Sequence, residues 1–136
     1  MTLRRIGDGP VVVACNTCRL SAEARDDAEG RRGGAALVEA LRRVHASDPA
    51  YAEVAVEAMP CLFACADFCT VHLGAPGKVG YVMGRFTPDD EAARAILDYA
   101  RAYAASDGGQ VSFRHWPEGV KGHFITRTPP QGFVVE

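Results

Sequence analysis

Five cysteines in two groups are the residues of this chain whose types and spacing could do chemistry. Cys15 and Cys18 form a C-x2-C pair, and Cys61, Cys65 and Cys69 form a C-x3-C-x3-C run. Thiolates are soft ligands that suit zinc, cuprous copper and iron–sulfur clusters. Where disulfides are disfavoured by a reducing compartment, such patterns indicate metal binding or thiol chemistry.

The amino-acid composition is typical of a globular protein. Of its 136 residues, 48% are hydrophobic and 24% are charged, and the formal net charge is -2. We therefore expect one domain over 1–136, with a core at about 11–106 and a tail over 107–136. A net charge this small generates no strong field that would attract nucleic acid or an anionic membrane.

The first residues do not resemble a targeting segment. Met1 to Asp8 is charged, and the only apolar run that follows is 11–14. A signal peptide needs about 7–15 apolar residues at this place, and a membrane-spanning helix needs about 20. We expect a cytoplasmic protein.

The periodicity along the chain predicts an α/β fold with the order β-α-β-β-β-α. An apolar run at 11–14 and an alternating run at 53–58 indicate strands, and a Gly/Pro turn at 74–78 indicates a hairpin between 70–73 and 79–83. A helical stripe follows Ala35, and a second helix begins after Thr87, its expected N-cap. Residues 110–136 look irregular.

This order predicts that the two cysteine groups meet in space. If 11–14 and 53–58 are parallel neighbours, their carboxyl ends lie at the same edge of the sheet. Cys15 follows the first strand and Cys61 the second, and Cys69 precedes an antiparallel third strand. Several thiolates brought together repel one another, so a metal is their natural counter-charge.

The spacing alone does not name the metal. A zinc ribbon repeats C-x2-C twice, and the cysteine runs of bacterial and plant-type ferredoxins are absent here. The C-x2-C pair alone is also typical of dithiol exchange.

The run Cys61-Leu62-Phe63-Ala64-Cys65, the Pro-Gly turn, Gly84 and the closing helix resemble the thioredoxin-like [2Fe-2S] ferredoxins. The resemblance implies a thioredoxin-like fold, a 2Fe-2S cluster, and cluster ligands at Cys15, Cys61 and Cys65. In those ferredoxins the second ligand lies about ten or more residues after the first. Here Cys18 follows after three, and Cys69 is additional, so the ligand set and a [4Fe-4S] alternative stay open.

The chain is also similar to a family of small bacterial proteins described as predicted metal-binding. The matching motifs are Cys15-Asn16-Thr17-Cys18-Arg19, the run from Cys61 to Cys69-Thr70-Val71, Ala75-Pro76-Gly77-Lys78 and Pro129-Pro130. Members are often linked with cobalamin biosynthesis genes, which implies a redox or metal-handling role.

Three hypotheses follow for the five cysteines Cys15, Cys18, Cys61, Cys65 and Cys69. The favoured one is a ferredoxin-like iron–sulfur protein that transfers electrons to a redox partner. The alternatives are a protein that delivers zinc, cobalt or copper to a metal-accepting partner, and a thiol oxidoreductase that uses Cys15 and Cys18. No phosphate loop, Ser/His/Asp constellation or paired-carboxylate site is present, so a carrier or metal-binding protein is favoured over an enzyme; a homodimer stays open.

The aromatic and basic residues of the tail permit two interpretations. The segment Arg114-His115-Trp116-Pro117 could cover the metal site or contact a partner. Packing against the core is favoured, because Trp and Phe side chains are large apolar groups that need cover.

Overall fold

Five strands and two helices form the structure, a computed structural model that describes residues 1–136. The strands are β1 (Val11–Cys15), β2 (Ala55–Met59), β3 (Val71–Gly74), β4 (Gly80–Met83) and β5 (Phe124–Thr128), and the helices are α1 (Gly33–Ser47) and α2 (Asp90–Ala105). Neither helix combines the length and the apolar character that crossing a membrane requires.

The strands form one mixed sheet in the order β2-β1-β3-β4-β5. β1 and β2 are parallel, with Cys15 opposite Met59, and α1 makes the crossover between them. β3 and β4 form an antiparallel hairpin, and β3 lies antiparallel to β1. The α/β fold with a mixed sheet and the β-α-β-β-β-α order is therefore confirmed.

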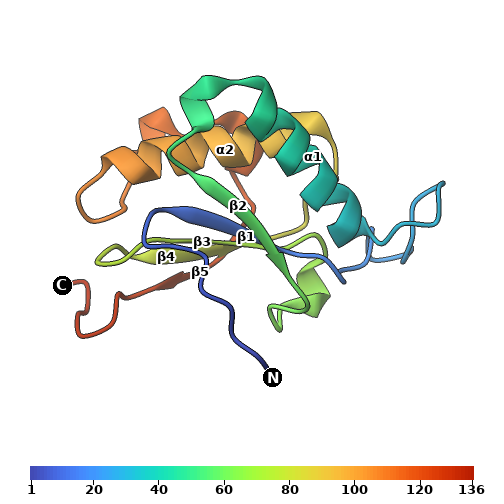
Figure 1. Ribbon diagram of the computed structural model, residues 1–136, viewed down its shortest axis with the longest axis horizontal. Helices are drawn as coiled ribbons and strands as arrows, with labels where there is room; N and C mark the ends of the chain where they lie inside the picture. Colours follow the sequence, from blue (N-terminus) through green and yellow to red (C-terminus); the bar gives the residue numbers. More distant parts are fainter.

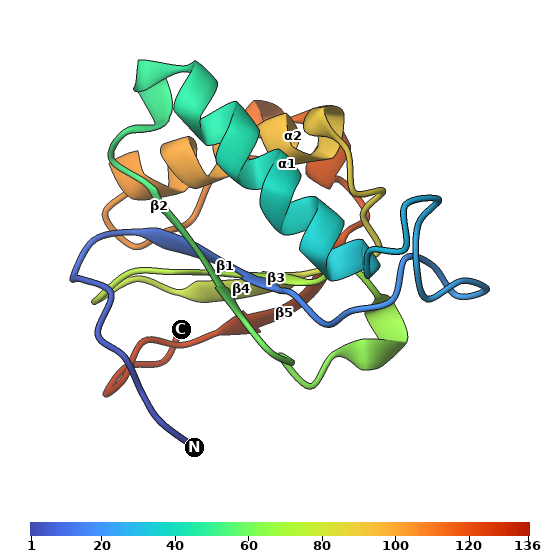
Figure 2. The same cartoon turned by 45° about the vertical axis from the view of Figure 1, so that its right-hand side comes forward.

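Both helices lie on the same face of the sheet, and the N-terminal segment leaves from the opposite side (Figure 1). Val12 and Ala14 of β1 point to this helix face and are fully buried, as are Leu41 of α1 and Ile96 of α2. A hydrogen bond of 2.5 Å from Arg43 to Asp90 joins the exposed sides of the two helices. The second view shows the same arrangement, with both helices above the sheet (Figure 2).

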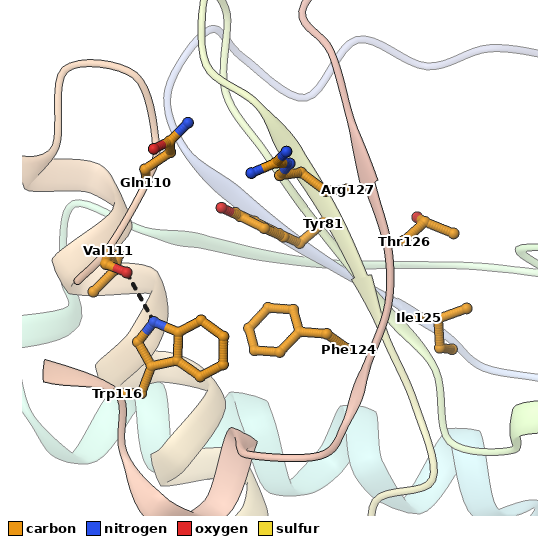
Figure 3. Close-up of a pocket in the computed structure, with 8 residues that line it drawn as sticks. All are labelled: Tyr81, Gln110, Val111, Trp116, Phe124, Ile125, Thr126 and Arg127. Atoms are coloured by element: carbon orange, nitrogen blue, oxygen red, sulfur yellow. Dashed lines mark hydrogen bonds between the residues drawn. The ribbon is translucent and has the colours of Figure 1, made fainter. Parts of the chain in front are cut away.

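The tail departs from the irregular conformation expected for it. Residues Phe124–Thr128 form β5, which pairs antiparallel with β4 at the edge of the sheet. Before it, Trp116 packs against Phe124 with ring centroids 4.7 Å apart (Figure 3). The side chains from Thr126 to Thr128 are exposed, so this edge strand lacks the apolar alternation that would have revealed it. The expected packing of Trp116 against the core is confirmed.

Helix α2 also begins later than its sequence suggests. Asp89, and not Thr87, is the N-cap, and its carboxylate accepts a hydrogen bond of 2.8 Å from the main-chain N–H of Ala92. Pro88 therefore precedes the cap. The cause is the competition between two capping side chains two residues apart, of which the carboxylate also benefits from the helix dipole.

Candidate metal centre

The ends of three strands bring the two cysteine groups to one end of the sheet. Cys15 is the last residue of β1, and its N–H donates to the carbonyl of Thr70, 3.0 Å away. The N–H of Asn16 donates to the carbonyl of Met59 at the same distance. The segments that carry Cys15, Cys61 and Cys69 are thus neighbours. In Figures 1 and 2 the chain after β1 continues to the right, and the chain after β2 turns below it and back toward the sheet.

Cys15 and Cys18 form a buried pair with unlike thiols. Burial opposes ionisation of Cys15, but hydrogen bonds with Thr17, with Cys18 and from the main chain of Cys61 outweigh it and lower its pKa to about 7. Burial raises the pKa of Cys18, and its hydrogen bond with Cys15 and the negative charge of Cys15 raise it further. Cys15 is therefore the thiol of this pair that the protein prepares as a thiolate.

Close packing of the backbone fixes this pair. The N–H of Gly34, at the start of α1, donates to the carbonyl of Cys18 over 3.1 Å. A Cβ atom at Gly34 would lie 2.0 Å from the carbonyl oxygen of Cys15, so only glycine permits the helix to approach this closely. Helix α1 thus begins directly against the C-x2-C segment.

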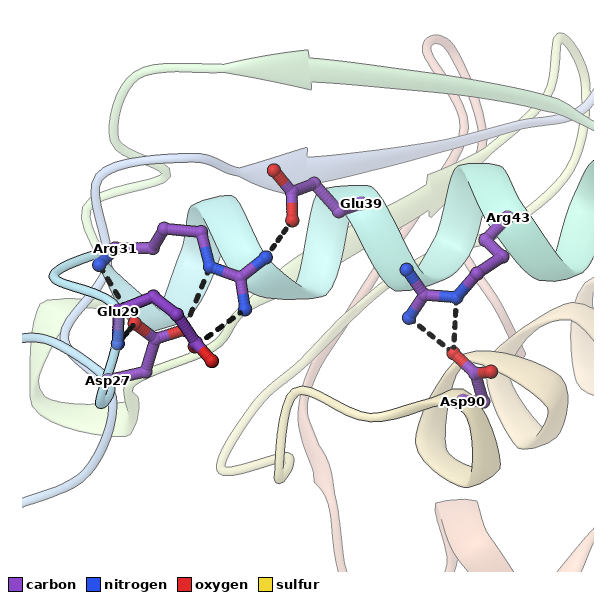
Figure 4. Close-up of polar contacts among 6 residues, drawn as sticks. All are labelled: Asp27, Glu29, Arg31, Glu39, Arg43 and Asp90. Atoms are coloured by element: carbon purple, nitrogen blue, oxygen red, sulfur yellow. Dashed lines mark hydrogen bonds and ion pairs between the residues drawn. The ribbon is translucent and has the colours of Figure 1, made fainter.

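A network of charged groups holds the loop between Cys18 and α1. The Asp27 carboxylate accepts hydrogen bonds from the main-chain N–H groups of Glu29 and Arg31, at 2.9 and 2.8 Å. The Arg31 guanidinium pairs with Asp27, Glu29 and Glu39 (Figure 4). These bonds fix the conformation of the loop that joins Cys18 to α1.

Cys61 and Cys65 form the second pair, with their sulfurs 3.8 Å apart. The Cys61 sulfur accepts a hydrogen bond of 3.3 Å from the N–H of Phe63, and Cys65 is exposed. The pKa of Cys65 is raised by its hydrogen bond with Cys61, then by the charges of Cys61 and Cys15. The second pair therefore lies within electrostatic reach of Cys15, at the ends of the adjacent strands β1 and β2.

Cys69 differs from the other four cysteines. Its side chain has no exposed surface, and its thiol donates to the carbonyl of Arg19 at 3.5 Å. Burial raises its pKa to about 12, with smaller contributions from the charges of Cys18 and Cys15. A thiol that is protonated and bonded to the backbone serves to hold the 19–20 segment in place.

The loop that carries Cys61, Cys65 and Cys69 has a strained backbone. Cys61, Phe63 and Cys69 have φ angles of 60°, 57° and 49°, a region that residues other than glycine seldom adopt. Arg85 braces the loop, since its N–H donates to the carbonyl of Phe68 over 2.7 Å. Strained conformations persist where their surroundings enforce them, and they are concentrated at functional sites.

Two hydroxyl groups contact the sulfurs and were not recognised in the sequence. The Thr70 hydroxyl lies 3.2 Å from the sulfur of Cys18, and the Thr17 hydroxyl lies 3.5 Å from that of Cys15. Thr70 itself is buried, with 1% of its surface exposed. Each threonine lies next to a cysteine in the chain, a placement that could have drawn attention to them.

The four remaining cysteines are arranged as two pairs. No group of three or more His, Cys, Asp or Glu side chains in the chain is arranged to hold a single metal ion. Cys15 with Cys18, and Cys61 with Cys65, instead present two dithiol units on adjacent strand ends.

The chain matches one known protein family over most of its length. Residues 12–130 match the family described as "Protein of unknown function (DUF1636)". The chain belongs to this family. No curated protein matches it.

Two solved structures of a thioredoxin-like [2Fe-2S] ferredoxin from Aquifex aeolicus have a similar fold. The first superposes with a TM-score of 0.54 at 17% sequence identity and covers 94% of this chain and 100% of the ferredoxin. The second, of the wild-type protein at 1.5 Å resolution, gives the same score and identity over 88% and 99% of the two chains. This DUF1636 member therefore has a thioredoxin-like fold of the kind found in that ferredoxin.

Proposed function

We propose that this protein holds an iron–sulfur cluster, of the [2Fe-2S] type, and acts as a ferredoxin-like electron carrier. Cys15, Cys18, Cys61 and Cys65 are the proposed ligands. The observation that carries the proposal is the meeting of two dithiol pairs at one end of a ferredoxin-like sheet. The whole chain, 1–136, then forms one metal-binding domain.

The chemistry of the donor set fits such a cluster. Four cysteine thiolates are the usual ligands of [2Fe-2S] clusters. The lowered pKa of Cys15 supplies one thiolate near neutral pH. A cluster with two irons needs two ligands at each, which suits two separate pairs better than a tetrahedral zinc shell of four convergent thiols.

The fifth cysteine is the proposed spare. Cys69 and Cys18 are both buried. The raised pKa of Cys69 keeps its thiol protonated at neutral pH, and this thiol donates a hydrogen bond to the carbonyl of Arg19. Cys18 instead contacts a hydroxyl group, which donates to its sulfur once the thiolate forms. This difference supports Cys18 as the fourth ligand.

When bound, the cluster would supply reversible uptake of an electron. The chain's own residues would set the conditions: Thr70 hydrogen-bonds a ligand sulfur, and burial of Cys15 and Cys18 keeps water from that pair. Phe63 lies between Cys61 and Cys65 and is 96% exposed. We place the contact with a redox partner protein over this side of the site, because an exposed aromatic ring beside the ligands favours association.

Two other functions would use the same cysteines. A protein that delivers zinc, cobalt or copper would exchange its metal with an accepting partner. A thiol oxidoreductase would use the adjacent Cys15 and Cys18 as a redox dithiol.

One experiment separates the three functions. The protein is purified without oxygen, its visible spectrum is recorded, and iron, sulfide, zinc, copper and cobalt are assayed. A brown protein with equal amounts of iron and acid-labile sulfide supports the proposal. A zinc, copper or cobalt protein without sulfide supports metal delivery, and a metal-free protein that reduces insulin disulfides supports thiol exchange. Either of these last results overturns the iron–sulfur proposal.

A further inference from the structure

The edge strand β5 borders a cavity that lies apart from the cysteines. Tyr99 of α2 reaches Phe124 at the start of β5, and the tail residues Gln110, Val111 and Trp116 lie beside the rest of the strand. This arrangement leaves a cavity of about 340 Å³ between the tail and the strand. In Figure 3, Trp116 and Phe124 lie in the lower part of the cavity and Arg127 lies above them. Its volume is in the range of small-molecule sites.

Aromatic rings form the apolar wall of this cavity. The rings of Trp116 and Phe124 are 4.7 Å apart and tilted by 41°. The indole N–H of Trp116 is already bonded to the carbonyl of Val111, 2.8 Å away, so its ring is fixed in orientation and its polar atom is satisfied. A rigid, satisfied aromatic surface favours a flat apolar ring as its ligand.

Polar groups gather on the opposite rim. Arg127 is exposed and takes part in none of the ion pairs of the chain. Gln110 adds an exposed amide, and the hydroxyl of Tyr81 points toward the Gln110 side of the cavity (Figure 3). A guanidinium without a carboxylate partner, beside an amide and a hydroxyl, is suited to bind an anionic group.

We propose that this cavity binds a small aromatic carboxylate. Its ring would lie against Trp116 and Phe124, and its carboxylate would accept hydrogen bonds from Arg127 and Gln110. The proposal does not depend on the iron–sulfur cluster, because none of these residues contacts a cysteine.

A buried tyrosine lies behind the aromatic wall of this cavity. Tyr99 packs edge-on against Tyr81 and Phe124, with ring centroids 5.9 and 5.2 Å away. Its hydroxyl is buried and has no hydrogen-bond partner in the protein. Because Tyr99 is fully buried and does not line the cavity, its ring supports the aromatic wall from behind, and its hydroxyl is not a contact for the ligand.

The single tryptophan makes the proposal directly testable. Trp116 is the only tryptophan of the chain, so selective excitation of its fluorescence reports on this cavity alone. Benzoate is titrated into the purified protein, and saturation-transfer NMR provides a second readout. We expect saturable binding with a Kd on the order of 1 mM. Benzyl alcohol, which keeps the ring without the charge, should bind about tenfold more weakly.

A pair of arginine variants tests whether Arg127 binds the carboxylate. Arg127→Gln should weaken benzoate binding about tenfold and leave benzyl alcohol unaffected, because only the carboxylate pairs with the guanidinium. Arg42→Gln, which removes an exposed arginine on α1, should change neither affinity. The proposal is overturned if neither readout saturates at concentrations well above 1 mM, or if both arginine variants have the same effect.

Discussion

The buried thiol of Cys69 donates a hydrogen bond to the main-chain carbonyl of Arg19, across 3.5 Å and between segments 50 residues apart. This bond attaches the loop after the C-x2-C pair to the loop before β3. It also engages the cysteine that we proposed as the spare, whose pKa burial raises to about 12. In the proposed cluster, Cys18 and not Cys69 would then be the fourth ligand.

Cys69→Ala should retain the full content of iron and sulfide, whereas Cys61→Ser or Cys65→Ser should lose it. The reason is that alanine removes a structural hydrogen bond worth about 1 kcal/mol, while serine removes a ligand. Iron and sulfide assays on the anaerobically purified variants make the comparison, with Cys18→Ser as the matched test of the other candidate. Loss of iron in Cys69→Ala together with its retention in Cys18→Ser would reverse the assignment.

Thr70→Val should lower the reduction potential of the cluster by some tens of millivolts. A hydrogen bond donated to a ligand sulfur stabilises the reduced, more negative state, and a tenfold change in that equilibrium corresponds to about 59 mV for one electron. Redox titration followed in the visible spectrum measures the shift. Thr126→Val, at an exposed position of β5, is the control and should leave the potential unchanged. An unaltered potential in Thr70→Val would mean that this hydroxyl does not tune the cluster.

Tyr103→Phe and Tyr99→Phe should have opposite consequences for folding, although both side chains are fully buried on α2. The Tyr103 hydroxyl donates to the carbonyl of Val79 at 2.6 Å, so its removal leaves that carbonyl unpaired and costs about 1–3 kcal/mol. The Tyr99 hydroxyl has no partner, and its removal should be neutral or stabilising. Urea unfolding of the two variants tests this. Equal destabilisation would show that Tyr99 also bonds through its hydroxyl.

The metal-free protein should show one thiol that ionises near neutral pH. The pKa of Cys15 is lowered from 9.0 to about 7, so the ultraviolet absorbance of thiolates should rise in a step near pH 7 that Cys15→Ser abolishes. Because the folded pKa is below the unfolded one, the thiolate stabilises the fold above pH 9.0, and this contribution is lost as the pH falls through about 7. If Cys15→Ser retains the step, another thiol is responsible for it.

Much of this fold follows from local sequence patterns. The apolar run before Cys15 and the alternation before Met59 identify β1 and β2, and the single helix between them implies that they are parallel. The common end of the two cysteine groups then follows from topology alone. The positive φ angles at Cys61 and Phe63 could not be foreseen, because no glycine marks these positions in the sequence.

Other features depend on tertiary contacts that no local pattern records. β5 is an edge strand with exposed Thr126 and Arg127, so its sequence resembles a polar loop. Cys18 and Cys69 are the same residue type and differ only in their contacts. The sulfur of Cys18 contacts the hydroxyl of Thr70, and that of Cys69 contacts the carbonyl of Arg19. The cavity beside Trp116 likewise exists only because the tail folds back over the sheet edge.

X-ray absorption at the iron edge of the anaerobically purified protein tests the central claim most directly. If two dithiol pairs share one dinuclear centre, the nearest neighbours of iron are all sulfur atoms, and each iron has one further iron close to it. Nitrogen or oxygen among those neighbours, an isolated iron, or a protein without iron would contradict the proposed centre.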